Sequence, residues 1–552
     1  MSSGDERLRH VIVVLLENRS FDHLLGYLEH PAASTFDGIR PGAATNPLDP
    51  SNPVAGVVHA QKRQRLRLRV DPDHAHASVM AQLGLSTNQD AQPTNSGFVW
   101  NYEQKATGRS PGSVKGGRTG RILNWTAVVA GLVGVAVAAF GFWWWALGLI
   151  VLAAALLFVR LKVVGNVDYF PGDGRRIMWC WDPKTIPAIA RLATSFALCQ
   201  RWFCSVPGET WPNRQFAHAA TSAGTVDIVT DLYRDRTIFE LLDDNGCDWG
   251  IYYDGPPQVT CYPALWEEPE KLARWYRIQH LFDHIAGGNL PTYSFLEPNH
   301  GYIGRSYSQH PGNNTRTNAD FTRADGFIAA LYEALRANPD LFAETLLLVT
   351  WDEHGGTFDH VPPPVAVPPD ARTQQFDFKR LGVRVPAIVI SPWVPAGTLD
   401  SDRVYDHASI PATLRQHFAP QAPPLNDREA AANSFVSLLT LGEPRTADQL
   451  PDLSKLVRRP RAAWNPLDPL ISWLRKLFRG DEELHTSLAR LSAHIDTAVS
   501  PASTPGAPPL LKPGAEPAPL PHVPALDRHR SSRAMKKFMT AAKQARGTGQ
   551  QP

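Results

Sequence analysis

The chain has 552 residues, of which 43% are hydrophobic and 20% charged, and its 55 basic and 53 acidic side chains leave a formal net charge of +2. This length exceeds one compact core of ordinary size, and the composition is too apolar and too evenly charged for a disordered protein, so we expect one large domain with additional segments. The near-zero net charge argues against a protein that chiefly binds nucleic acid, and no nucleic-acid partner is predicted.

The first predicted element is a strand at residues 11–16, a short apolar run rich in β-branched side chains that is followed by Glu17 and Asn18. Such runs are typical of strands buried on both faces of a parallel sheet. The run is too short for the hydrophobic region of a secretory signal, and residues 1–10 are polar, so no N-terminal signal peptide is predicted.

Other apolar runs predict further parallel strands at residues 249–253, 346–350 and 387–390, with helices at residues 187–200 and 319–338. Strands that alternate with helices predict an α/β fold, with a central, mostly parallel sheet and helices on both faces. In such sheets ligands bind beyond the carboxyl ends of the strands. Those ends carry Glu17-Asn18, Asp254, Asp352-Glu353 and Ser391-Pro392.

An insertion at residues 107–167 contains a segment, residues 122–159, without a single Asp, Glu, Lys, Arg or His. This segment predicts contact with the lipid bilayer. One straight helix of this length would extend about 50–55 Å across a hydrocarbon core of about 30 Å. Basic residues flank both ends and mark the cytoplasmic side, which favours a two-pass hairpin and a membrane-associated enzyme whose catalytic domain is cytoplasmic. A tilted single span and a buried core helix are the alternatives.

The C-terminal quarter differs from the preceding chain. Residues 445–500 form a predicted amphipathic helical extension, in which residues 464–479 fit either a membrane-surface helix or a packed helix. Residues 501–552 combine a Pro-rich linker with a basic tail and are predicted to be disordered. The basic tail is a further candidate contact with anionic lipid.

The acidic pairs after two of the strands suggest a metal site. Glu17 with Asn18, and Asp352 with Glu353, would meet at one edge of the sheet, and their oxygen atoms suit a divalent cation that offsets the repulsion between carboxylates. The alternative for each pair alone is helix capping.

A second candidate is Thr210, in the motif Val-Pro-Gly-Glu-Thr-Trp-Pro-Asn-Arg of residues 206–214. Pro212 fits the first turn of a helix, so Thr210 would lie at a helix N-terminus, where anions bind. Its hydroxyl is either an N-cap or a metal-bound nucleophile.

Several histidines lie in segments punctuated by glycine and proline. They include His74, His300, His310, His354 and His360. Cleavage of a phosphate ester needs a proton donor for the leaving group and donors for the phosphoryl oxygens, and imidazole supplies both near neutral pH. A structural role is the alternative for each of them.

Five motifs together resemble one known family: HVIVVLLENRSFDHLLG (residues 10–26), SVPGETWPNR (205–214), TWDEHGGTFDHVPPP (350–364), GVRVPAIVISPW (382–393) and DHAS (406–409). They look like the bacterial phosphoesterase family that contains non-haemolytic phospholipases C and a respiratory-burst-inhibiting acid phosphatase. The resemblance runs from residue 8 to residue 440, apart from the insertion, and defines the expected catalytic domain. It implies a fold like that of alkaline phosphatases.

The resemblance also implies a set of site residues. These are Glu17, Asn18, Thr210, Asp352 and Glu353 as metal ligands, Thr210 as nucleophile with His74 and His310 in catalysis, and Asn18, His354 and His360 in phosphate binding. Pro-Gly after His310 and Asp-Pro-Asp before His74 depart from the family pattern. The family's twin-arginine export signal and the C-terminal repeats of its longer phospholipases C are also missing from the sequence.

The predicted function is therefore metal-dependent hydrolysis of phosphate esters, foremost phospholipase C-type cleavage of phospholipids through a phosphothreonine intermediate. An acid phosphatase acting on soluble phosphomonoesters and a non-catalytic membrane scaffold are the alternatives. One divalent ion is expected, and calcium, magnesium, manganese, zinc and iron all fit the ligands.

Overall fold

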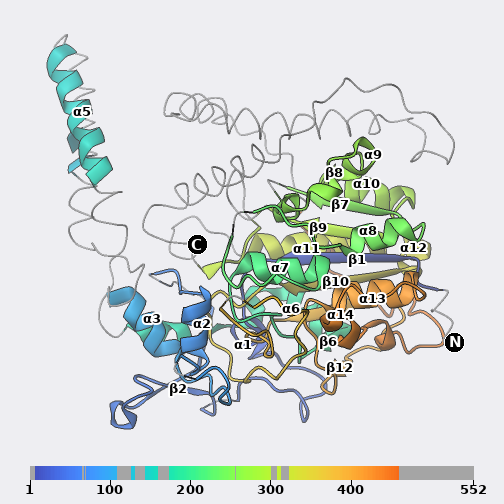
Figure 1. Cartoon of the computed structure of the whole chain (residues 1–552), viewed down its shortest axis with the longest axis horizontal. Helices are drawn as coiled ribbons and strands as arrows, with labels where there is room; N and C mark the ends of the chain where they lie inside the picture. Colours follow the sequence, from blue (N-terminus) through green and yellow to red (C-terminus); the bar gives the residue numbers. More distant parts are fainter. Residues whose placement is uncertain are drawn as a thin grey trace.

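The computed structural model describes residues 7–458, with long gaps at 108–125, 131–142 (except 133), 160–172, 300–306 and 312–321 and short gaps at 41, 65–67, 69, 87, 128, 230, 255–256 and 374. Within this part of the chain, eight strands form one sheet in the order β12-β6-β11-β10-β1-β9-β7-β8 (Figure 1). In chain order they are β1 (His10–Leu16), β6 (Ala197–Cys199), β7 (Trp249–Tyr253), β8 (Trp275–Arg277), β9 (Tyr293–Glu297), β10 (Thr345–Trp351), β11 (Ala387–Ile390) and β12 (Leu399–Asp400). Two small sheets pair β2 (Thr45–Pro47) with β3 (Val57–His59) and β4 (Gln61–Arg63) with β5 (Trp179–Trp181).

The large sheet is mostly parallel, as predicted. Strands β10, β1, β9, β7 and β8 pair in parallel, and among the described strands of this sheet only β11 runs against its neighbours, β10 and β6. The prediction of a parallel strand at residues 387–390 was therefore wrong in direction, because an apolar run indicates that a strand is buried but not which way it runs. Ser391-Pro392 consequently lies at the edge opposite the carboxyl ends of β1 and β10.

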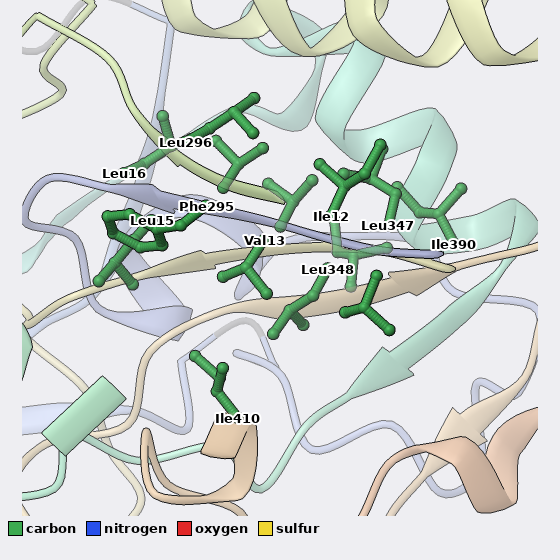
Figure 2. Close-up of a cluster of buried hydrophobic side chains, with 14 of the residues drawn as sticks. Ile12, Val13, Leu15, Leu16, Phe295, Leu296, Leu347, Leu348, Ile390 and Ile410 are labelled. Atoms are coloured by element: carbon green, nitrogen blue, oxygen red, sulfur yellow. The ribbon is translucent and has the colours of Figure 1, made fainter. Parts of the chain in front are cut away.

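Helices cover both faces of the sheet. One group comprises α6 (Pro187–Ser195), α10 (Gln279–Gly287), α11 (Thr322–Arg336) and α12 (Pro339–Ala343), and the other comprises α7 (Thr210–Ala219), α8 (Ile238–Asp244), α13 (Ser409–Phe418) and α14 (Asp427–Ala431). Figure 2 shows Ile410 of α13 approaching the sheet from the face opposite α6 and α11. Side chains such as Ile12, Val13 and Leu348 fill the space on either side, which explains why β1 and β10 read as continuous apolar runs.

The helix predicted at residues 187–200 ends earlier than expected. The α6 helix stops at Ser195, and the buried residues that follow form β6, which pairs with β11 and β12. Burial in the sheet thus overrides the helical pattern of this segment. The helix predicted at 319–338 is confirmed as α11 over its described residues.

Of the other α-helices and the longest 3-10 helix, α9 (Pro269–Leu272) lies beside β8 of the large sheet, and the rest lie nearer the small sheets and the insertion (Figure 1). The rest are α1 (Phe21–Leu25), α2 (His76–Gln82), α3 (Phe98–Thr107), α5 (Trp143–Val159) and the 3-10 helix η3 (Asp173–Met178). The α5 helix projects away from the sheet and its covering helices (Figure 1). Among the described residues, no helix combines the length and the apolar character needed to cross a membrane. Most of residues 122–142 and all of 459–552, including the predicted hairpin turn, residues 464–479 and the basic tail, lie outside the described residues.

Candidate active site

The two predicted acidic pairs lie side by side at the carboxyl edge of the sheet. Leu16 pairs with Trp351 in adjacent parallel strands, and the Asp352 amide donates to the Leu16 carbonyl at 3.0 Å. The Asn18 amide donates to Asp352 Oδ1 at 3.2 Å, and the Asn18 side-chain amide donates to Glu353 Oε1. Asn18 adopts a left-handed backbone conformation, with φ of 54°. This conformation is uncommon outside glycine, although Asn tolerates it better than most residues.

Thr210 faces this group from the first residue of α7. Its Oγ1 donates to Asn18 Oδ1 at 3.5 Å. The N-cap of α7 is Glu209, in extended conformation and without a side-chain capping bond, so the alternative that Thr210 serves as the N-cap is wrong. Thr210 instead places a hydroxyl beside the free backbone N–H groups of the first helical turn, which favour a bound anion.

The loop before Thr210 is held rigidly. Asn213 accepts from the Val206 amide at 3.1 Å and its side-chain amide donates to the Val206 and Glu209 carbonyls, also at 3.1 Å. A Cβ on Gly208 would lie 2.1 Å from the Val226 carbonyl oxygen, so only glycine fits. The sequence Gly-Glu-Thr-Trp-Pro-Asn therefore fixes the position of the hydroxyl.

Arg214, one turn further along α7, balances part of the acidic charge. Its Nε donates to Asp352 Oδ2 at 2.9 Å, and its Nη1 lies 3.3 Å from Glu297 Oε1. Burial, together with the charges of Glu17 and Glu353, nevertheless raises the pKa of Asp352, and Arg214 only partly offsets this. The carboxylates at this edge are thus more numerous than this arginine alone neutralises.

The predicted metal ligands offer the oxygen atoms that hard divalent cations prefer, although among the described residues their carboxylates do not form a group of three within 4.8 Å of one another. Glu17, Asp352 and Glu353 are buried carboxylates, and Asn18 and Thr210 add neutral oxygen atoms. Ser308 Oγ donates to Glu17 Oε2 at 2.6 Å and orients that carboxylate. An additional positive charge here would relieve the repulsion that raises the pKa of Asp352.

His74 and His310 lie together beside this donor set. Their rings meet edge to face with centroids 5.0 Å apart. His74 Nε2 is 3.9 Å from Glu353 Oε1, and His310 Nδ1 is 3.4 Å from Asp71 Oδ1. Burial opposes the charged form of His74, but Glu353, Asp71 and Glu209 outweigh it and raise its pKa to about 8. These neighbours therefore favour the charged form of His74.

His354 adjoins the site in a different way. Its Nε2 contacts Gln82 Oε1 at 2.8 Å, its Nδ1 lies 3.3 Å from Glu353 Oε2, and burial lowers its pKa. The neutral ring thus braces Glu353. Its predicted contact with phosphate stays a prediction. His300 lies outside the described residues.

His360 belongs to a second cluster. Its Nδ1 contacts Asp22 Oδ2 at 2.6 Å and its Nε2 contacts Asp37 Oδ1 at 3.2 Å. Arg384 donates to Asp22 Oδ1 at 3.0 Å and to Asp359 Oδ1 at 3.1 Å. Both ring nitrogens of His360 are thus engaged by carboxylates of this cluster.

The same cluster meets a geometric criterion for metal ligation. In the part of the chain that is described, Asp22, Asp359 and His360 are the group of three acidic or imidazole ligands whose atoms lie within 4.8 Å of one another. Arg384 already supplies positive charge to both carboxylates. Burial favours the neutral form of His360, but the hydrogen bonds that its ring donates to Asp22 and Asp37 outweigh burial and raise its pKa to about 10. Arg384 and His360 thus already supply positive charge within this cluster, and we interpret it as an ion-pair network of the fold; the predicted contact of His360 with phosphate stays a prediction.

Comparisons with known proteins match residues 162–419 to the phosphoesterase family. Non-specific phospholipase C1 of Arabidopsis thaliana is 30% identical over 477 residues, which cover 83% of this chain and 76% of the relative. The chain belongs to the phosphoesterase family. Non-hemolytic phospholipase C of Pseudomonas aeruginosa is 27% identical over 53% of the chain and 48% of the relative, and phospholipase C B of Mycobacterium tuberculosis is 26% identical over 79% and 78%.

This phosphoesterase is therefore a hydrolase, as its motifs predicted, and its relatives include plant as well as bacterial proteins. Sequence reasoning missed several residues that support its site. Arg214 stood within a motif but was not singled out, whereas Ser308 and Gln82 carry no local signal, because their partners Glu17 and His354 are far away in the chain. His407, whose Nε2 contacts the Asp352 carbonyl at 2.6 Å, lay in the recognised Asp-His-Ala-Ser motif.

Proposed function

We propose that this phosphoesterase is a metal-dependent phospholipase C that cleaves the glycerol–phosphate bond of phospholipids with Thr210 as nucleophile. The observation that carries the proposal is the Thr210 hydroxyl 3.5 Å from Asn18 Oδ1, at a helix N-terminus and beside the buried carboxylates that end β1 and β10. The names of the relatives support the choice of a phospholipid substrate.

Glu17, Asn18, Thr210, Asp352 and Glu353 would hold the cation, which when bound lowers the pKa of a coordinated hydroxyl and neutralises phosphoryl charge. The Thr210 hydroxyl passes its proton to solvent water, and its oxygen attacks phosphorus and forms a phosphothreonine ester. The amides of the first turn of α7 donate to the phosphoryl oxygens.

The bond from phosphorus to the diacylglycerol oxygen breaks as the new bond forms. The neighbours of His74 favour its charged form, and its ring stands beside His310, so this pair is the source of the proton that the leaving oxygen takes up. Water then attacks the phosphothreonine, releases the phosphorylated headgroup and restores the Thr210 hydroxyl.

The test measures products with the purified full chain. Phosphatidylcholine vesicles should yield diacylglycerol and phosphocholine, and Thr210→Ala should give neither. Chelation should abolish release, and adding back calcium, magnesium, manganese, zinc or iron one at a time identifies the ion. Faster turnover of a soluble aryl phosphomonoester than of any lipid would favour the acid phosphatase alternative. Full lipid turnover by Thr210→Ala would contradict the nucleophile.

We also infer that the enzyme is associated with the membrane through residues 122–159. The described part, α5, carries no charged residue and exposes Leu147, Ile150, Val151 and Leu152. Exposed apolar side chains in such a row are favourable against lipid. Basic flanks at both ends support a catalytic domain on the cytoplasmic side. Protease added to intact cells should spare the domain and cut it after lysis, whereas cleavage in intact cells would contradict this side.

A further inference from the structure

The two ends of the insertion leave the catalytic domain at one place. The α3 helix precedes it and η3 follows it, and these two elements pack against each other. The Gly174 amide donates to Glu103 Oε2 at 2.8 Å, and a Cβ on Gly174 would lie 2.6 Å from the same oxygen. Whatever the path of the residues between them, the segment that carries α5 starts and finishes here.

A cluster of basic side chains surrounds a tryptophan at this place. Arg63 of β4 lies over the Trp179 ring at 5.2 Å, and Arg176 of η3 lies over the same ring at 4.7 Å. Lys62, Arg63 and Arg175 are exposed, and Arg176 and Trp179 are partly exposed. We call these five residues the basic–aromatic surface. The pairing of β4 with β5 brings Arg63 and Trp179 together, although they are distant in the sequence.

Two acidic side chains near this surface accept hydrogen bonds from nearby backbone amides. Asp182 is buried and accepts from the Lys184 amide at 3.1 Å, and Glu103 accepts from the Gly174 amide. The basic–aromatic surface thus presents the Arg63 and Arg176 side chains over one indole, with Arg175 exposed next to Arg176 in the sequence and Lys62 over the Tyr27 ring at 5.9 Å. Indole rings favour the boundary between headgroups and acyl chains, and guanidinium groups bind phosphate with two parallel hydrogen bonds.

We propose that the basic–aromatic surface docks the enzyme on a bilayer that contains anionic phospholipid. Charge complementarity selects this partner, and the exposed apolar row of α5 belongs to the segment that emerges from the same place. The proposal rests on the proposed phospholipase function for its biological sense, but it concerns binding and not turnover. Each basic residue close to an anionic surface strengthens binding by about 5-fold.

The same elements also contact the catalytic loop. Lys105 of α3 lies 3.3 Å from Asp73, the residue before His74, and Asn101 of α3 accepts from Gln82, the partner of His354. The α3 helix therefore packs against η3, which carries part of the docking surface, and also contacts the segment around the catalytic histidine. Docking at this surface would bring that segment to the membrane with the lipid substrate.

The test measures binding of the full chain to vesicles by flotation, without any turnover. The patch variant combines Arg63→Gln, Arg175→Gln and Arg176→Gln, and the matched control combines Arg9→Gln, Arg234→Gln and Lys455→Gln, which remove the same charge from exposed positions elsewhere. Vesicles contain phosphatidylcholine alone or with about one third phosphatidylglycerol. The wild type and the control should prefer the anionic vesicles, and the patch variant should lose that preference by about 10- to 100-fold. Added salt should weaken wild-type binding.

Turnover of a soluble phosphate ester serves as the independent readout. Equal turnover by all three proteins shows that the patch variant is folded, so its loss of binding supports the proposal even if the lipid is not the substrate. Equal binding of neutral and anionic vesicles by the wild type, or the same loss in patch and control variants, overturns it. The proposal is also overturned if duplex DNA binds through the same three residues and displaces the enzyme from the vesicles, because the surface would then suit nucleic acid. A phospholipase activity that fails while anionic binding persists would refute the proposed function alone.

Discussion

Two groups of residues with buried carboxylates lie on the loops that follow β1 and β10, and they differ in how much positive charge surrounds them. The structural cluster of Asp22, Asp359 and His360 has Arg384 among its carboxylates, with contacts of 3.0 and 3.1 Å. The edge group of Glu17, Asn18, Asp352 and Glu353 has Arg214 on one side, bonded to Asp352. The pKa of Asp352 remains raised by burial and by the neighbouring carboxylates.

The difference shows how a ligand-binding group can be distinguished from a structural group when both contain the same types of residue. Buried charges persist in proteins when they are paired, and a group left short of positive charge is suited to binding a cation from outside. The structural cluster is complete without a ligand, whereas the edge group is short of positive charge and faces a hydroxyl at a helix N-terminus. Each of the following predictions tests one side of this contrast.

The largest effect is expected for Thr210→Ala. Removing the nucleophile should lower turnover of any phosphate ester by about 10⁴-fold or more, because no covalent intermediate can form. Thr210→Ser should keep most of the activity. Thermal unfolding should change little, since the Thr210 hydroxyl makes only a long contact of 3.5 Å with Asn18. Similar turnover by the Ala and Ser variants would assign the reaction to another group.

The next effect is expected for Arg384→Gln in the structural cluster. Loss of the guanidinium leaves Asp359 buried without its ion-pair partner and Asp22 with His360 alone, and the free energy of unfolding should fall by about 3–5 kcal/mol. Urea unfolding measures the change. Bound metal per chain should not fall in the variant that remains folded. A stability within 1 kcal/mol of the wild type, given as a rough limit, would show that the cluster takes its charge from elsewhere.

Glu17→Gln tests the edge group, where removal of one charge is expected to leave stability unchanged or to raise it, in contrast to Arg384→Gln. The variant keeps an oxygen that can accept from Ser308 but removes one negative charge, so affinity for the divalent ion should fall by about 10- to 100-fold. In the presence of chelator its stability should equal or exceed that of the wild type, because repulsion with Asp352 is reduced. Calorimetric titration measures the affinity for the ion, and urea unfolding measures the stability. Asp22→Asn is the matched control, and it should lose stability without losing metal affinity.

The smallest effect concerns pH. Burial favours the neutral form of His360, but the hydrogen bonds that its ring donates to Asp22 and Asp37 outweigh burial and raise its pKa to about 10, above its value of 6.5 in an unfolded chain. The stabilising contribution of the charged ring is therefore complete below pH 6.5 and disappears as the pH rises through 10. We expect a loss of about 1–2 kcal/mol across this range that is absent from His360→Gln. Parallel pH profiles for the two proteins would show that the ring is not charged in the fold.

The sequence predicted the elements whose signal is local. Continuous apolar runs located β1 and β10 to within a residue or two, and the polar residues after them were placed correctly at one edge. The direction of β11 carried no such signal, because burial on both faces produces the same run in either direction. The pairing of His360 with Asp22 and Asp37 also escaped prediction, since it depends on loops that meet only in the folded chain.

The packing of α3 against η3 has a consequence for how such an enzyme arises. Because the chain returns to the same spot after residues 108–172, those residues behave as a cassette whose gain or loss leaves the register of the central sheet intact. Replacing the cassette with a short Gly-Ser turn would be expected to yield a compact catalytic body. Under the proposed membrane association, gain or loss of this segment would decide whether the hydrolase is held at a bilayer.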